Sequence, residues 1–381
     1  MNYEFLGQRL RISRERARLN QSQAAQLLEL TPAALNQYES GKRRVDALQL
    51  ERLARLYGVP LRSLFSEETT RTDWEESLRL CSEKISTSGK AGIGQLIEEI
   101  FTLEELYTET ETPFPGIPHP PFAPFTESQL HETEAGIWAA QKARSHYNLG
   151  IAPLIDVGRF LEALGLMVFR IPFGKEQDAI SGVFFLHPKL GTIAALNLEQ
   201  EVNRHPFTLT YGLAYSLFLY DRPAVILRHG DTTPLENFAQ TFAAYFLIPA
   251  TALQQRLQAL GVKVVRNPAT VVNLAYYFGV SYEEMLYRLQ LEHRLVNSQN
   301  NFQNVKPLLL ARCLGFPSDD RFRQGSIALE EMLPRIFIEL GFRAVEQSKL
   351  SLRRVAEMLG ISDIELEERL YEIEETKYNF Y

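Results

Sequence analysis

Two neighbouring side-chain amides, Asn36 and Gln37, lie in a segment that is predicted to form a short helix over residues 32–39. Thr31 is expected to be its N-cap, because a threonine oxygen can accept a first-turn N–H and the proline that follows is favoured at the first helical position. The helical period leaves Ala33 exposed beside the two amides. Amides can pair with base edges through two hydrogen bonds, and an alanine methyl can contact a thymine methyl. The segment therefore predicts a helix that reads DNA in the major groove.

Residues suited to phosphate contacts flank this predicted helix. Gln21 begins the preceding predicted helix, over residues 21–28, where its side chain and the N–H groups of the first turn can hold a phosphate. Lys42 and Arg43 follow the second helix and are expected to contact the DNA backbone beyond it. Residues 1–65 contain 11 Lys or Arg and 6 Asp or Glu, a net charge of +5, whereas the remainder carries 29 basic and 41 acidic residues, or −12. This asymmetry favours a nucleic-acid-binding head on an acidic body.

The first 66 residues are predicted to form five short helices. Their order and turns resemble the lambda-repressor/Cro-like, or XRE-family, helix-turn-helix domain along the run LNQSQAAQLLELTPAALNQYESGKRRVDALQLERLARLYGV. The resemblance implies a DNA-binding domain over residues 1–66 of a bacterial transcription regulator, located in the cytoplasm and associated with the nucleoid when bound. Because one such module reads only a half-site, we expect a homodimer on a palindromic double-stranded operator. The competing interpretation is a small helical bundle with a solvated basic face.

Residues 67–128 are predicted to be a linker made of two parts. The first part, up to about residue 110, is acidic and mostly helical. The second part, TPFPGIPHPPFAPF over residues 112–125, holds six prolines and no charged residue, so it cannot be helical. We expect an extended segment whose phenylalanines pack on a neighbouring surface, with a disordered linker as the alternative. A single helix is predicted from about residue 127 to 147.

The middle of the chain carries a second set of candidate chemical groups on two predicted helices, over residues 207–220 and 235–247. The first contains Tyr211-Gly212-Leu213-Ala214-Tyr215, and the second contains Glu236. The surrounding segments, ISGVFFLHPKLGTIAALNLEQEVNRHPFTLTYGLAYSLFLYD and PLENFAQTFAAYFLIP, resemble the ImmA/IrrE-type zinc peptidase domain over residues 129–298. In that family, the five positions of the first helix hold two histidine ligands with the general-base glutamate beside the first, and a glutamate of the second helix is the third ligand.

At these positions the chain departs from the family pattern. Tyrosines replace both histidines, and a phenol with a pKa of about 10 is a poor zinc ligand at neutral pH. Gly212 replaces the general base and cannot transfer a proton. Only Glu236 keeps a group able to bind metal, and the nearby His187, His205 and His229 lack a second histidine one helical turn away. We therefore expect a peptidase scaffold without zinc, cofactor or enzymatic activity.

Two roles for the altered positions stay open. In the first, Tyr211 and Tyr215 fill the former metal cavity, and one phenol is hydrogen-bonded to Glu236. In the second, the cleft between the two helices still admits a small-molecule or peptide effector that changes DNA binding, with the same three residues as its pocket.

Residues 299–381 are predicted to form a further helical unit. The run SLRRVAEMLGISDIELEERLYEI imitates a helix-turn-helix, but residues 363–375 hold seven acids and one base, which is the wrong sign for DNA. Packing or self-association is expected instead.

The whole sequence predicts a mainly α protein whose body contains a small sheet. No apolar run reaches the roughly 18 residues that a membrane span needs, and the two cysteines match no metal-binding spacing. The function expected is a repressor-like, sequence-specific DNA-binding regulator whose body senses an effector or dimerises. The alternatives are an active zinc metallopeptidase that cleaves a partner regulator, and an antitoxin-like protein that regulates its own gene.

Overall fold

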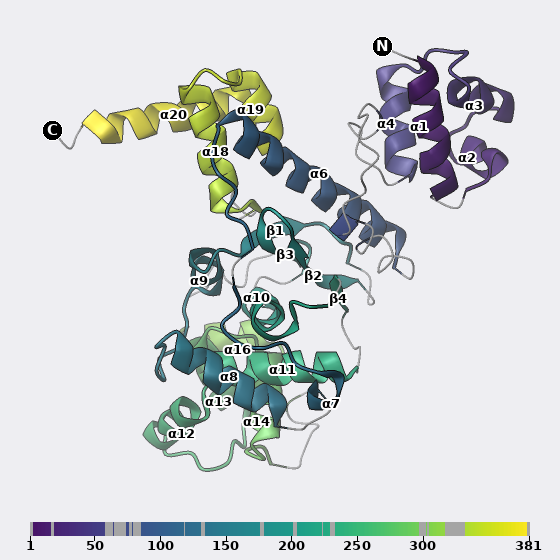
Figure 1. Ribbon diagram of the computed structural model, residues 1–381. Helices are drawn as coiled ribbons and strands as arrows, with labels where there is room; N and C mark the ends of the chain where they lie inside the picture. The colour runs from purple at the N-terminus through teal and green to yellow at the C-terminus, as the bar shows by residue number, and fades with distance from the viewer. Residues whose placement is uncertain are drawn as a thin grey trace. The chain divides into compact units, whose positions relative to one another are not determined.

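The computed structural model describes residues 3–16, 19–57, 64, 74–75, 78, 85–117, 119–130, 134–175, 179–200, 204–222, 224–228, 233–296, 302, 305–316 and 332–378. Helices dominate these residues, and one four-stranded sheet lies in the middle of the chain, as the sequence predicts (Figure 1). Two compact units are present: residues 1–105 with 172–174, and residues 106–171 with 175–381. The predicted division of the chain into four domains, with boundaries after residues 66, 128 and 298, stays a prediction.

Four helices of the first unit share one apolar core. They are α1 (Tyr3–Arg16), α2 (Gln21–Leu27), α3 (Pro32–Glu39) and α4 (Ala47–Tyr57). Side chains from all four are buried together: Leu6, Leu10, Ala24, Ala25, Leu28, Leu35, Tyr38, Leu50, Leu53, Ala54 and Tyr57. The fifth predicted helix lies outside the described residues, except for the buried Leu64.

Side chains set the beginnings of α2 and α3. Asn20 and Gln23 form a reciprocal capping box at α2. Thr31 accepts the Ala34 N–H at 3.2 Å and Pro32 takes the first helical position of α3, so the predicted N-cap is confirmed.

The end of α3 packs against the backbone of α1 at Gly7. A Cβ atom at this position would lie 2.6 Å from the carbonyl oxygens of Tyr38 and Glu39, so only glycine fits without a shift of the backbone. Gly41 then turns the chain away with a φ of 69°, in the left-handed region that favours glycine. These two glycines fix where α3 ends relative to α1.

The helix α6 (Thr87–Glu109) forms most of the described part of the predicted helical linker, and residues 74–75 and 78 before it are also helical. Residues 112–117 and 119–125 follow it without helix, and they are packed onto the second unit. Phe122 stacks on Phe218 at 4.9 Å between ring centroids, and the Phe125 N–H donates to the Phe218 carbonyl at 2.8 Å. The expectation of an extended segment held by its phenylalanines therefore agrees with the structure.

The sheet of the second unit has the strand order β1-β3-β2-β4. Strand β1 (Met167–Ile171) runs parallel to β3 (Gly191–Asn197), and β2 (Ile180–His187) is antiparallel to both β3 and β4 (Val225–Arg228). The strand β4 forms one edge of the sheet. The helix α10 (His205–Ala214) contacts β2 and β3 and continues into a π-helical turn, η4 (Tyr215–Leu219).

The helices α9 (Val157–Ala163), α8 (Ala135–His146) and α11 (Pro234–Leu247) complete this part of the core. The prediction of one helix over residues 127–147 is wrong. The structure has a short α7 (Glu127–Leu130) and then α8, with Glu134 in a turn. Close packing sets the path of α8, because a Cβ at Gly136 would lie 2.7 Å from the Phe238 carbonyl oxygen of α11.

The remaining helices are α12 (Ala250–Ala259), α13 (Pro268–Phe278), α14 (Tyr282–Leu291), α16 (Pro307–Cys313), α18 (Arg335–Glu346), α19 (Leu352–Leu359) and α20 (Asp363–Tyr378). Lys349, which follows α18, pairs with Glu111 at 2.6 Å, and Arg343 donates to Thr112 at 3.0 Å. These contacts attach the C-terminal helices to the chain just beyond α6. No helix in the described ranges is long and apolar enough to span a membrane.

Candidate functional site

The exposed side of α3 carries the three side chains that the sequence predicts. Ala33, Asn36 and Gln37 are exposed, while Leu35 and Tyr38 of the same helix are buried. The helical period was thus assigned correctly. The surface that results presents two amides and a methyl group, the groups that can contact the base edges of a major groove.

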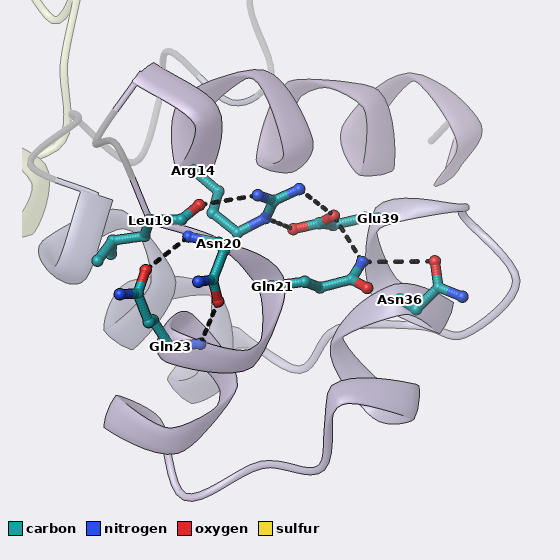
Figure 2. Close-up of polar contacts among 7 residues, drawn as sticks. All are labelled: Arg14, Leu19, Asn20, Gln21, Gln23, Asn36 and Glu39. Atoms are coloured by element: carbon teal, nitrogen blue, oxygen red, sulfur yellow. Dashed lines mark hydrogen bonds and ion pairs between the residues drawn. The ribbon is translucent and has the colours of Figure 1, made fainter.

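A buried ion pair joins α3 to α1 (Figure 2). The Arg14 Nε donates to Glu39 Oε1 at 2.6 Å and its Nη2 donates to Oε2 at 3.0 Å, while its Nη1 donates to the Leu19 carbonyl at 2.8 Å. The two side chains are only 9% and 3% exposed. Such a two-bond pairing of guanidinium and carboxylate fixes both distance and orientation.

Gln21 extends this network to the exposed side of α3. Its Nε2 donates to Glu39 Oε2 at 3.0 Å and to Asn36 Oδ1 at 3.4 Å, so the three side chains form one chain of contacts (Figure 2). The sequence predicts a phosphate contact for both the Gln21 side chain and the N–H groups of the first turn of α2, whereas the structure engages the side-chain NH2 group within the domain. In the first turn of α2 the Asn20 side chain accepts the Gln23 N–H at 2.8 Å, and the phosphate contact at Gln21 stays a prediction.

The basic residues after α3 are held close to its end. The N–H groups of Lys42 and Arg43 donate to the Gln37 carbonyl at 3.0 and 3.2 Å. The Arg43 guanidinium also lies over the Tyr38 ring, 5.4 Å from its centroid. Both side chains are exposed, so their charges flank the amides of α3.

Arg14 and Glu39 are not among the residues that the sequence predicts for this site. A signal was present, because Glu39 follows Leu35 by four residues and Arg14 follows Leu10 by four, which places both charges on the buried sides of their helices. A charge at such a position is rarely tolerated without a partner. The partner could not be identified because it lies 25 residues away.

The second candidate set lies in the body, and its two tyrosines are buried. Tyr211 packs beside Phe207, 5.8 Å between ring centroids, and burial raises the pKa of its phenol, with further contributions from Glu236, Tyr287 and Glu284. The Tyr215 hydroxyl donates to the Arg222 carbonyl at 2.9 Å. Burial therefore keeps the Tyr211 phenol protonated at neutral pH, and the Tyr215 hydroxyl is engaged as a hydrogen-bond donor.

Glu236 lies in the first turn of α11, where its N–H donates to Thr233 Oγ1 at 3.2 Å. It lines a cavity of about 300 Å³ together with Arg222 and the edge strand β4. Tyr211 and Tyr215 do not line this cavity. The three residues that the sequence grouped as one pocket are thus divided between the core and the cavity wall.

The side of α10 at Gly212 faces the sheet. A Cβ atom there would lie 2.9 Å from Cε1 of Phe184 in β2 and 3.3 Å from the Cβ of Ala194 in β3. Phe184 is only 1% exposed, so its ring has no room to withdraw. A glutamate at this position would meet the Phe184 ring.

The two described histidines near these positions have structural contacts. His187 accepts the Leu190 N–H at 3.1 Å through its Nδ1, and His205 Nε2 lies 3.3 Å from the Asn197 carbonyl. Burial lowers the pKa of each to about 4, helped by Lys189 and Arg170 respectively. His229 lies outside the described residues.

The donor set fits a zinc ion poorly. Its two phenols are buried, the pKa of the Tyr211 phenol is raised, and Glu236 contributes one carboxylate. Across the part of the chain that the structure describes, no three His, Cys, Asp or Glu side chains are grouped closely enough to hold a metal ion.

Two segments of the chain match known family models. A helix-turn-helix domain family model matches residues 6–65, and an IrrE N-terminal-like domain model matches residues 161–290. No curated protein matches the chain. The chain therefore joins an XRE-like helix-turn-helix domain to an IrrE N-terminal-like domain.

Proposed function

We propose that the protein is a repressor-like, sequence-specific transcription regulator of a bacterial cytoplasm that reads DNA with α3. The observation that carries this proposal is the exposed set Ala33, Asn36 and Gln37 on α3. The buried side of this helix is joined to α1 by the Arg14–Glu39 ion pair. Direct readout requires donors and acceptors held in one orientation, and the Gln21 contact to Asn36 supplies that constraint.

Phosphate contacts position this helix in the proposal. The first turn of α2, at Gln21, and the exposed Lys42 and Arg43 lie on either side of the α3 amides along the chain. Thr31, exposed at the N-cap of α3, is the remaining candidate for a backbone contact. Contacts of this kind fix register but carry no sequence information, whereas Gln37 and Asn36 select the bases.

In this proposal the IrrE N-terminal-like body has lost zinc chemistry and serves sensing or dimerisation. The support is the buried tyrosines and the position of Gly212 against Phe184. An effector, if it binds at the former metal position, has access to Glu236 through the cavity beside β4. Tyr211 and Tyr215 then support that wall from inside the core.

Substitution of Gln37 by alanine tests base reading. The change removes one amide from the exposed side of α3, and we expect binding to the preferred site to weaken by about 1–3 kcal/mol, with little effect on random duplex DNA. Arg43→Ala should weaken both by similar amounts and reduce the salt dependence of binding. Fluorescence anisotropy over a range of salt concentrations measures both effects.

Gln258→Ala is the matched control for these variants, because Gln258 is also an exposed helical glutamine but lies on α12 of the second unit. It should bind both DNAs like the unaltered protein. Unchanged site preference in Gln37→Ala would show that α3 is not the helix that reads bases.

Binding as a dimer is the second expectation. Two α3 helices related by a two-fold axis would occupy half-sites about one helical turn apart, about 34–36 Å between centres. Multi-angle light scattering of the full chain on a palindromic duplex should give two chains per duplex. A monomer in the absence of DNA, together with one chain per duplex in its presence, contradicts the proposal.

The proposed loss of zinc chemistry is tested by metal content. We expect the full chain, washed with a chelator and returned to buffer with equimolar zinc, to retain no stoichiometric metal by elemental analysis and to cleave no protein substrate. One tightly held zinc ion per chain would contradict this part of the proposal.

The position of Gly212 gives a structural test of the same claim. Gly212→Ala should lower the free energy of unfolding by about 1–3 kcal/mol, because the new methyl group meets the buried Phe184 ring. Gly158→Ala in α9 is the control, since its Cβ would approach no atom closer than 3.5 Å. Urea unfolding of both variants measures the difference, and equal stability would mean that position 212 is open toward the former metal position.

A further inference from the structure

A second cavity lies where the C-terminal helices meet the sheet-containing part of the second unit. Its volume is about 340 Å³, and its walls come from the end of α9, the start of β1 and the first turn of α18. It shares no lining residue with the cavity beside Glu236. This volume is at the lower end of the range for small-molecule sites, which favours a ligand smaller than a nucleotide.

The lining of this cavity combines an apolar wall with four charged groups. The apolar groups are Ala163, Leu166, Met167 and Ile336, and the charged groups are Arg159, Glu162, Arg335 and Glu339. Two positive and two negative charges leave no net charge, so the cavity attracts a polyanion no more strongly than a neutral molecule. The ligand that fits this lining best has one positively charged group, one negatively charged group and an apolar side chain.

Both guanidinium groups are available for exchange of partners. Arg335 pairs with Glu339 at 3.1 Å, with side chains 76% and 49% exposed, and Arg159 pairs with Asp156 at 3.4 Å, 84% and 55% exposed. Exposed pairs of this kind contribute only about 0–1 kcal/mol. A ligand carboxylate can therefore replace a protein carboxylate at either arginine with little loss.

Glu162 supplies a carboxylate that can pair with a positively charged group of the ligand. It accepts the Arg335 N–H at 3.3 Å, at the first turn of α18, and burial raises the pKa of its carboxyl group. The pKa rises because the ionised form lacks solvation, even though Arg170 and Arg335 oppose the shift. A ligand ammonium group beside Glu162 would stabilise the ionised carboxylate.

We propose that this cavity binds a free amino acid with an aliphatic side chain. Its carboxylate contacts the Arg335 and Arg159 guanidinium groups, its ammonium group contacts Glu162 and Glu339, and its side chain packs on Leu166, Met167 and Ile336. Since α9 and α18 both contribute to the wall, the bound amino acid connects the C-terminal helices to the body. The site is separate from the DNA-reading surface, and binding is tested without DNA, so its failure leaves the proposed regulator function intact.

The test is isothermal titration calorimetry of the full chain with L-leucine, L-isoleucine, L-valine and L-methionine, each used alone. At least one should saturate a single site per chain. Its N-acetyl derivative, which lacks the ammonium group, and its amide, which lacks the carboxylate, should each bind at least about tenfold more weakly. The absence of saturable binding by all four amino acids overturns the proposal, as does equal affinity for either derivative.

Two substitutions locate the site. Arg335→Ala and Glu162→Gln should each weaken binding of the same amino acid at least about tenfold. The matched control is Arg353→Ala on α19, because Arg353 forms a pair of the same spacing with Glu357 at 3.4 Å, 79% and 56% exposed, away from the cavity. This control should bind like the unaltered chain. Unchanged binding in both cavity variants, with circular dichroism showing intact folding, overturns the assignment.

Discussion

The ion pair between Arg14 and Glu39 is the interaction on which the surface that we propose to read DNA depends. Removing two charges from water costs several kcal/mol per ion, so a buried pair persists only where good geometry and further hydrogen bonds offset that cost. Here Arg14 also donates to the Leu19 carbonyl, and Glu39 also accepts the Gln21 amide. The pair thus connects α1, α2 and α3, and through Gln21 it constrains Asn36 at the protein surface.

Packing explains how the body accommodates tyrosines at the positions that hold the histidine ligands in the ImmA/IrrE-type pattern. Tyr211 and Tyr215 belong to the apolar core that α10, α11 and the sheet share, and Gly212 allows α10 to approach Phe184. The π-helical turn η4 follows α10 directly, and the ring of its Phe218 packs against the rings of Phe122 and Phe125 of the extended segment. Aromatic contacts between distant segments therefore hold this region together.

The sequence predicts those features that depend on local period and capping. The bounds of α3, its Thr31 cap and its exposed amides follow from spacing within one helix. Features that depend on contacts between distant residues could not be predicted. The Arg14–Glu39 pair spans 25 residues, the Phe184 ring that excludes a side chain at Gly212 comes from another element, and Glu162 lies 173 residues from Arg335. The close approach of α8 to α11 at Gly136 is likewise a contact between distant residues.

Simultaneous replacement of Arg14 and Glu39 by methionine tests the central claim most directly. Exchange of a buried ion pair for apolar side chains is often neutral for stability, so the double variant should fold, as circular dichroism would verify. It should nevertheless lose the anchor of Gln21 and Asn36. Selection of bound sequences from a random duplex pool should therefore give a common motif with the unaltered chain and a weaker motif, or none, with the variant. Enrichment of no motif by the unaltered chain, or of the same motif with equal affinity by the folded variant, would contradict the account.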